Sequence, residues 1–242
     1  MDTLTSLWRD SGRDVSWAKG EGSPTKAITP MSVPGIKSKP SYRALTFDET
    51  GHDHYFVAFG SGLKAVTRCL NSCTISAHCI HVYAVTGPES SDTKQQQAGH
   101  VHSFFDDSSE LLQNLREQLL RCCMGSRFSI VGPEIFLWEV SELLANFGVM
   151  NDEIQRELLG SAARRVFCVH CRYIQNSVTS NIAPCPSCHN ILSVWDHFSR
   201  AHSAYMGVAA NAEVSHEIPD QVEVFLWWPR ALSKFVLQKL II

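Results

Sequence analysis

Four cysteines in the C-terminal third of the chain have the spacing of a single metal site. They form two C-x-x-C pairs, Cys168 with Cys171 and Cys185 with Cys188, separated by thirteen residues. Each C-x-x-C forms a tight knuckle in which two thiolates converge on one ion and backbone N–H groups bond to sulfur. The intervening segment is long enough for one hairpin that brings the knuckles together. We therefore predict that these four cysteines bind a metal ion.

The donor set restricts the metal and its role. Four thiolates suit tetrahedral zinc, and they also suit a single rubredoxin-type iron. Rubredoxin knuckles typically carry glycine after the second cysteine of each pair, where this chain has Arg172 and His189. This difference favours zinc. His170 and His189 are possible substitute ligands, and because four cysteines are present we expect both to be bystanders. A closed four-thiolate site leaves no coordination position for substrate, so the predicted role of the metal is structural. Metal binding at such a site contributes on the order of 10 kcal/mol to the free energy of folding. No catalytic residue is predicted.

Two glycine turns form a second candidate site. Gly60-Ser61-Gly62 follows the apolar run at 55–59 and precedes a helical pattern, which is the context in which a helix N-terminus holds phosphate. Gly132-Pro133 follows another apolar run in the same way. The carboxyl ends of parallel strands meet at one edge of a sheet, where a doubly wound domain binds its ligand. These five residues are therefore the predicted dinucleotide-binding residues. The alternative is that the glycines only provide a positive φ.

The elements that position both candidate sites follow from hydrophobic periodicity. Strands are expected near 44–47, 55–59, 80–85 and 128–131, and helices from 63, over 108–122, over 134–147 and over 151–159. Asp107 and Glu110 form a predicted capping box, and Gly148 ends the third helix. Strands that alternate with helices indicate an α/β fold with a parallel, nucleotide-binding-like sheet. A small zinc-ribbon module follows it.

Composition divides the chain into four predicted segments. Residues 1–41, rich in Gly, Pro, Ser and Lys, form a flexible arm. Residues 42–162 form the α/β domain and residues 163–213 the four-cysteine ribbon. Residues 214–242 form an apolar tail, expected to contain a buried strand and an amphipathic helix.

Charge and hydropathy exclude several function classes. The chain has 242 residues, with 21 basic against 24 acidic side chains, so nothing predicts binding to nucleic acid or an anionic membrane. No apolar run is long enough to span a bilayer, which needs about 18 residues or more. The first twenty residues are charged and lack a secretory h-region. The cysteines outside the two pairs are irregularly spaced and do not form the pattern of a disulfide framework. A reducing compartment, the cytoplasm, is therefore the expected location.

The predicted α/β domain resembles the NAD(P)-binding half of the ferredoxin-reductase family. The resemblance covers roughly residues 42–159 and rests on the early glycine turn and on residues 128–134, Phe-Ser-Ile-Val-Gly-Pro-Glu, before an amphipathic helix. That family has Cys-Gly-Pro at this turn, and Val131 stands in place of the cysteine. The resemblance implies a site for NADPH.

The C-terminal module resembles the small DmmA subunit of bacterial dimethylamine monooxygenase. The four cysteines are followed by Val-Trp-Asp-His-Phe-Ser-Arg at 194–200 and Ala-Tyr-Met-Gly-Val at 204–208. The resemblance implies an accessory, electron-transfer or docking subunit of an NADPH-dependent monooxygenase that oxidatively demethylates a small secondary amine. Haem and flavin/iron–sulfur groups are then expected on partner subunits. Nicotinamide donates two electrons as hydride and haem accepts one at a time, so a flavin-bearing partner has to divide the pair.

Two other functions stay open at this point. A rubredoxin-like electron carrier would hold iron in the four-cysteine site. A nucleic-acid-binding zinc ribbon would need a basic surface, and residues 164–213 contain only four arginines and no lysine.

Overall fold

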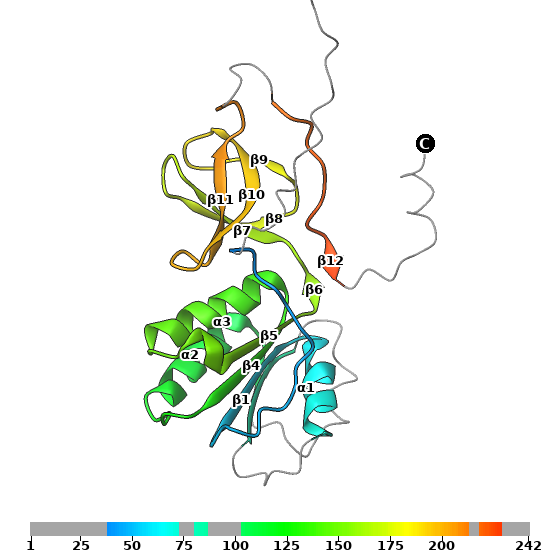
Figure 1. Ribbon diagram of the computed structural model, residues 1–242, viewed down its shortest axis with the longest axis vertical. Coiled ribbons are helices and arrows are strands. Elements are labelled where there is room, and N and C mark those ends of the chain that lie inside the picture. The colour runs from blue at the N-terminus through cyan, green and yellow to red at the C-terminus, as the bar shows by residue number, and fades with distance from the viewer. Residues whose placement is uncertain (1–37, 73–79, 87–102, 213–217, 229–242) are drawn as a thin grey trace, which may run out of the picture. The chain divides into compact units, whose positions relative to one another are not determined.

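The computed structural model describes residues 38–72, 80–86, 103–212 and 218–228 (Figure 1). The first part of the fold contains β1 (His54–Phe59), α1 (Gly62–Leu70), β2 (Ile80–Val85), β3 (Ser103–Phe105), α2 (Ser108–Leu119), β4 (Arg127–Gly132), α3 (Glu134–Asn146), the 3-10 turn Asn151–Glu153 and β5 (Ile154–Leu158). The second part contains β6 (Gly160–Ser161), β7 (Arg164–Cys168), β8 (Ile174–Val178), β9 (Ile182–Pro184), β10 (Ile191–Ser199), β11 (Ala204–Ala209) and β12 (Trp227–Trp228).

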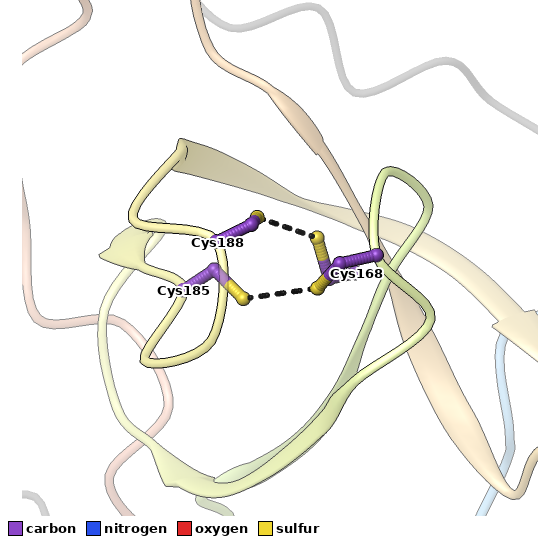
Figure 2. A group of neighbouring side chains, drawn as sticks. Cys168, Cys185 and Cys188 are labelled. Atoms are coloured by element: carbon purple, nitrogen blue, oxygen red, sulfur yellow. Dashed lines mark hydrogen bonds between the residues drawn. The ribbon is translucent and has the colours of Figure 1, made fainter.

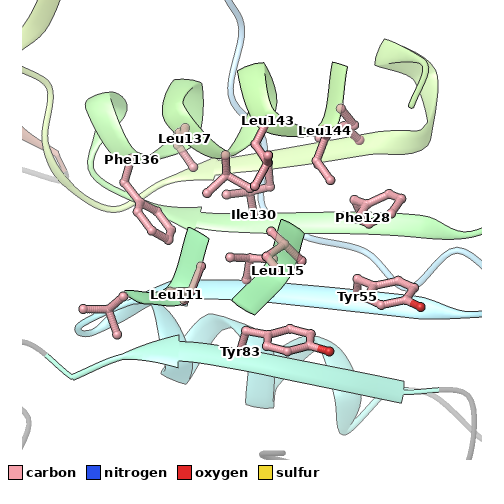
Figure 3. Packing of buried hydrophobic residues seen from close by; sticks show 14 of the residues in the cluster. Tyr55, Tyr83, Leu111, Leu115, Phe128, Ile130, Phe136, Leu137, Leu143 and Leu144 are labelled. Atoms are coloured by element: carbon pink, nitrogen blue, oxygen red, sulfur yellow. The ribbon is translucent and has the colours of Figure 1, made fainter. Parts of the chain in front are cut away.

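The first sheet is parallel throughout, as the sequence predicts. Its strand order is β3-β2-β1-β4-β5, and β1 pairs with both β2 and β4. Helix α1 covers one face of this sheet, where it contacts β1 and β4. Helices α2 and α3 contact each other and cover the opposite face of the sheet. Figure 3 shows Leu111 and Leu115 of α2 and Leu137 of α3 on the face of the sheet from which Tyr55, Tyr83 and Ile130 project, and all six belong to one core. The domain is therefore a doubly wound α/β fold.

The central strands are buried on both faces of the sheet, and their apolar runs account for this. Successive side chains of a strand point to opposite faces. In β1, Tyr55 and Val57 enter the core beneath α2 and α3, whereas Phe56 and Ala58 enter the core beneath α1. A strand covered on both faces shows a continuous hydrophobic run, which is what residues 55–59 display.

The predicted helix signals are largely confirmed. The Asp107 carboxylate accepts a hydrogen bond from the Glu110 backbone N–H at 2.9 Å, which caps α2. The apolar side chains Phe136, Val140, Leu143 and Leu144 of α3 lie in the core, and Gly148 ends the helix with φ of +83°. Helix α2 ends at Leu119, three residues earlier than predicted.

Two predicted elements are wrong. Residues 151–159 were expected to form a helix, and they form a 3-10 turn followed by β5, which pairs in parallel with β4. Polar residues in β5 interrupt the apolar pattern that would have predicted a strand. One of them, Glu157, is buried because Arg68 and the Leu45 N–H bind its carboxylate. Residues 44–47 form no strand. They run beside β5 through side-chain bonds and one backbone bond, Arg43 N–H to Arg156 O at 3.3 Å.

The second sheet has the order β8-β7-β11-β10-β9. Only β7 and β11 pair in parallel, and the other pairs are antiparallel. The strand expected in the tail is present only as the two-residue β12, and the residues before it are not buried: Val222 and Val224 are each about half exposed. These residues lie beside residues 179–181 through backbone bonds, and β12 then pairs with β6.

Two predictions fall outside the described residues: most of the arm (1–37) and the amphipathic helix of the tail, which would follow residue 228. Within the described ranges, no helix is long and apolar enough to cross a membrane.

Candidate metal centre

The four cysteine sulfur atoms lie together, as the spacing predicts. All four are within 4.8 Å of one another and could hold a metal ion. Figure 2 shows the sulfurs of the two knuckles facing each other, with Cys168 to Cys188 at 3.7 Å and Cys171 to Cys185 at 3.6 Å. Four sulfurs about 2.3 Å from a tetrahedral zinc would be about 3.8 Å apart. These two distances therefore fit one tetrahedral ion.

Each knuckle is closed by the same backbone pattern. The N–H of the residue after each pair bonds to the carbonyl of its first cysteine, Arg172 to Cys168 at 2.8 Å and His189 to Cys185 at 2.9 Å. Arg172 and His189 adopt left-handed backbone, with φ of +66° and +59°. The positions where rubredoxin has glycine thus have a conformation that favours glycine, although the residues differ. The absence of glycine is therefore no argument against iron.

The pKa values of the cysteine thiols are shifted in both directions: that of Cys171 falls, and those of Cys168 and Cys188 rise. The Tyr173 backbone N–H bonds to the Cys171 sulfur and is the main reason that the pKa of this thiol falls to about 6. Burial acts in the opposite direction at Cys168 and raises the pKa of that thiol. Several thiolates at this spacing repel one another, and a bound cation removes that repulsion. His170 and His189 are both exposed and lie outside the cluster.

Glycine at position 189 is expected to stabilise the ribbon slightly. Left-handed backbone costs a non-glycine residue about 1–2 kcal/mol, and glycine adds about 0.5–1 kcal/mol of unfolded-chain entropy. H189G should therefore raise the free energy of unfolding by up to about 1 kcal/mol, measured by urea denaturation. H170G is the matched control, because His170 has no positive φ, and it should destabilise by about 0.5–1 kcal/mol. A loss of stability in H189G equal to that in H170G would contradict the argument.

The two predicted glycine turns lie at one edge of the parallel sheet, because β1 and β4 are neighbours. Packing accounts for glycine at two positions. A Cβ on Gly62 would be 2.9 Å from the Val131 carbonyl oxygen, and a Cβ on Gly132 would be 2.9 Å from Cβ of Phe59. Ser61 precedes α1 without a side-chain cap, and the Pro133 carbonyl accepts the Leu137 N–H. A dinucleotide at these residues stays a prediction.

Alanine at position 62 is expected to destabilise the α/β domain by about 1–3 kcal/mol, because its methyl group meets backbone of the central strand β4. Urea denaturation measures the difference. The control is G60N: Gly60 has φ of +52° and no atom within 4 Å of an added Cβ, and asparagine tolerates this conformation. Equal stability of G62A and G60N would show that the close approach at β4 is not limiting.

Comparison with known proteins identifies both parts of the fold. The N-terminal domain of the family described as dimethylamine monooxygenase subunit DmmA-like matches residues 34–154. The C-terminal domain of the same family matches residues 165–208, which include all four cysteines. The chain belongs to the DmmA-like family. The heme-dependent oxidative N-demethylase delta subunit of Ectopseudomonas mendocina (strain ymp) is 29% identical over 152 residues, which are 60% of this chain and 87% of the relative.

Solved structures are more distant from this DmmA-like chain. The ferredoxin reductase in carbazole 1,9a-dioxygenase (FAD apo form) has 15% identity and a TM-score of 0.36, covering 48% of this chain and 35% of that one. The siderophore-interacting protein SipS from Aeromonas hydrophila has 15% identity and a TM-score of 0.34, covering 46% of this chain and 47% of that one. The chain thus spans less than half the length of either structure.

A buried polar network connects the two matched segments of this DmmA-like chain. Glu134, the first residue of α3, is 4% exposed. Its Oε1 accepts hydrogen bonds from the hydroxyls of Tyr42 and Tyr205, both at 2.7 Å. Trp138 donates from Nε1 to the Tyr42 hydroxyl at 2.8 Å. Burial raises the pKa of Glu134, and the two hydroxyls oppose that shift. Burial also raises the pKa of both tyrosines, which stay neutral donors.

Arg164 extends this network into the second sheet. Its guanidinium lies 3.8 Å from the Tyr205 ring centroid and 3.6 Å from that of Phe225, and Nη2 bonds to Asp196 at 2.6 Å. Lys39 reaches the other oxygen of the same carboxylate at 3.0 Å. The sequence did not predict the network, because its members are scattered from position 39 to position 225. The one available signal was an acidic residue at the start of a helix whose other first-turn residues are apolar.

Proposed function

We propose that this chain is an accessory subunit of a multicomponent, NADPH-dependent monooxygenase that removes a methyl group oxidatively from a small secondary amine. The observation that carries the proposal is the match of both domains to one family of dimethylamine monooxygenase subunits. The relative from Ectopseudomonas mendocina, a delta subunit of a heme-dependent oxidative N-demethylase, supports it. Haem, flavin and iron–sulfur groups then belong to partner subunits.

In this proposal the four-cysteine centre holds structural zinc in the second domain. The donor set supports it, because four thiolates fill a tetrahedral coordination sphere and leave no position for substrate. The burial of Cys168 and Cys185 supports it too, since both lie in the core of the second sheet. A site with these features contributes to folding and not to the reaction. Its function is to hold β10 and β11 in shape for contact with a partner.

Reconstitution tests the proposed function. The purified subunits are assayed for amine-dependent NADPH oxidation and formaldehyde release from dimethylamine, with and without this chain. We expect activity only when the chain is present. As a control, the C123S variant should support the same activity as the unchanged chain, because Cys123 is exposed and lies outside the metal cluster. Undiminished activity of the other subunits alone would reject an essential role.

A rubredoxin-like electron carrier is the second candidate, and the left-handed backbone at Arg172 and His189 is the observation that favours it. Iron in four thiolates gives visible charge-transfer absorption, whereas zinc gives a colourless protein. Metal analysis of the purified chain together with its visible spectrum decides between them: one zinc per chain and no visible band rejects the carrier.

A further inference from the structure

A basic cavity lies beside the edge strand β5, away from both candidate sites. Its volume is about 520 Å³. Its lining residues come from the segment before β1, from α3, from β5 and the turn before it, and from the turn after β10. Four of them are cations, Lys39, Arg43, Arg156 and Arg200, and none is an aspartate or glutamate. Lys39 is paired with Asp196, so three guanidinium groups determine the charge of the cavity.

Arg156 is held in place at the cavity by neutral groups, and no described residue forms an ion pair with it. Its Nε donates to Ser141 Oγ at 2.7 Å and its Nη1 to Asn151 Oδ1 at 3.0 Å, both neutral acceptors. The guanidinium carbon lies 4.9 Å from the Trp138 ring centroid. Burial lowers the pKa of Arg156 to about 10, and the positive charge of Arg200 adds to this effect while Tyr42 opposes it. The two arginine charges are thus close enough to repel each other.

The other two arginines of the cavity have no polar partner among the residues that the structure describes. Arg43 and Arg200 are exposed, and within the described part of the chain neither side chain takes part in an ion pair or a hydrogen bond. Three like charges gathered at one concave surface repel one another, and an anion between them changes repulsion into attraction. Guanidinium groups present forked donors that match phosphate oxygens two at a time.

We propose that this cavity binds a small, multiply charged phosphate-bearing molecule. Its volume is within the range of small-ligand sites, about 300–1,000 Å³. Three unpaired cations match a ligand of two or more negative charges better than a single carboxylate. The Trp138 ring already contacts Arg156 and Phe198 and is 7% exposed, so this ring offers no open face for a base. Recognition is therefore of the anionic group. The site is independent of the metal centre and of the proposed reaction.

Calorimetric titration of the full chain with inorganic pyrophosphate tests the proposal. We expect saturable binding that weakens as salt is raised. The variants R200Q and R43Q should each weaken it about tenfold or more, because each removes a charge-assisted contact. Both side chains are exposed and make no polar contact with the described residues, so these variants should fold normally. R116Q is the matched control: Arg116 is exposed on α2 and does not line the cavity, and its loss should leave the affinity unchanged.

Four outcomes would overturn the proposal. The first is absence of saturable pyrophosphate binding, and the second is equal affinity of R200Q, R43Q and the unchanged chain. Citrate binding as tightly as pyrophosphate would reject a phosphate-bearing ligand in favour of a polycarboxylate. Tighter binding of a hexaglutamate peptide, abolished in R200Q, would instead assign the cavity to an acidic segment of a partner protein.

Discussion

Replacement of Cys185 by serine is expected to abolish metal binding and unfold the second sheet. Cys185 is 1% exposed and packs with Cys168, Val166 and Leu192 in the core of that sheet. A four-thiolate zinc site contributes on the order of 10 kcal/mol to the folding of a small domain, and three ligands with a buried hydroxyl retain little of it. Most of the conformational stability of residues 164–209 should therefore be lost.

Three measurements check this expectation: metal content, hydrogen exchange of the β7–β11 amides and urea denaturation. C185S should contain less than one metal ion per chain, and its amides in the second sheet should exchange rapidly. C123S is the matched control, since Cys123 is exposed and outside the cluster, and it should retain metal and stability. One bound metal and unchanged amide protection in C185S would show that Cys185 is not a ligand.

The sequence was sufficient where the signal is local. Two C-x-x-C pairs predict a cluster because each knuckle is built from four consecutive residues. Only one hairpin is then needed to bring the two knuckles together. Burial on both faces of β1 gives an apolar run at 55–59, and turns end it. Helix α3 shows its apolar spacing together with Gly148 as its stop.

The sequence was insufficient where a polar side chain is buried by a distant partner. Arg156 and Glu157 obscured the strand pattern of β5, because a buried carboxylate becomes tolerable only when Arg68 and the Leu45 N–H bind it. Neither partner is near β5 in the sequence. The basic cavity has the same origin, since Arg43, Arg156 and Arg200 meet only in the folded chain.

Loss of the Glu134 carboxylate is the second large effect. E134A removes the acceptor of two tyrosine hydroxyls, one of them on Tyr205, which is 2% exposed. Each buried hydroxyl left without its partner costs about 1–3 kcal/mol. Removal of a buried charge relieves part of the desolvation penalty that raises the pKa of Glu134. The unpartnered hydroxyls outweigh this relief, and we expect a net loss of about 2–4 kcal/mol in urea denaturation.

The variant E134Q separates the acceptor from the charge. Glutamine retains an oxygen for both hydroxyls, so E134Q should cost much less than E134A. E142A is a further control on the same helix: the Glu142 carboxylate is half exposed, and its pair with Arg165 should contribute about 0–1 kcal/mol. Equal losses in E134A and E142A would show that the network does not stabilise the fold.

The pH dependence follows from the direction of the Glu134 pKa. A carboxyl whose pKa in the folded state lies above the unfolded value of 4.5 binds its proton more tightly when folded. This tighter binding of the proton contributes to the free energy of unfolding. The contribution is fully present below pH 4.5 and is lost as the pH rises through the folded-state pKa. The free energy of unfolding of the unchanged chain should therefore rise relative to that of E134Q as the pH is lowered from 7. A constant difference between the two proteins across this range would mean that Glu134 titrates normally, and that the two tyrosines offset the cost of its burial.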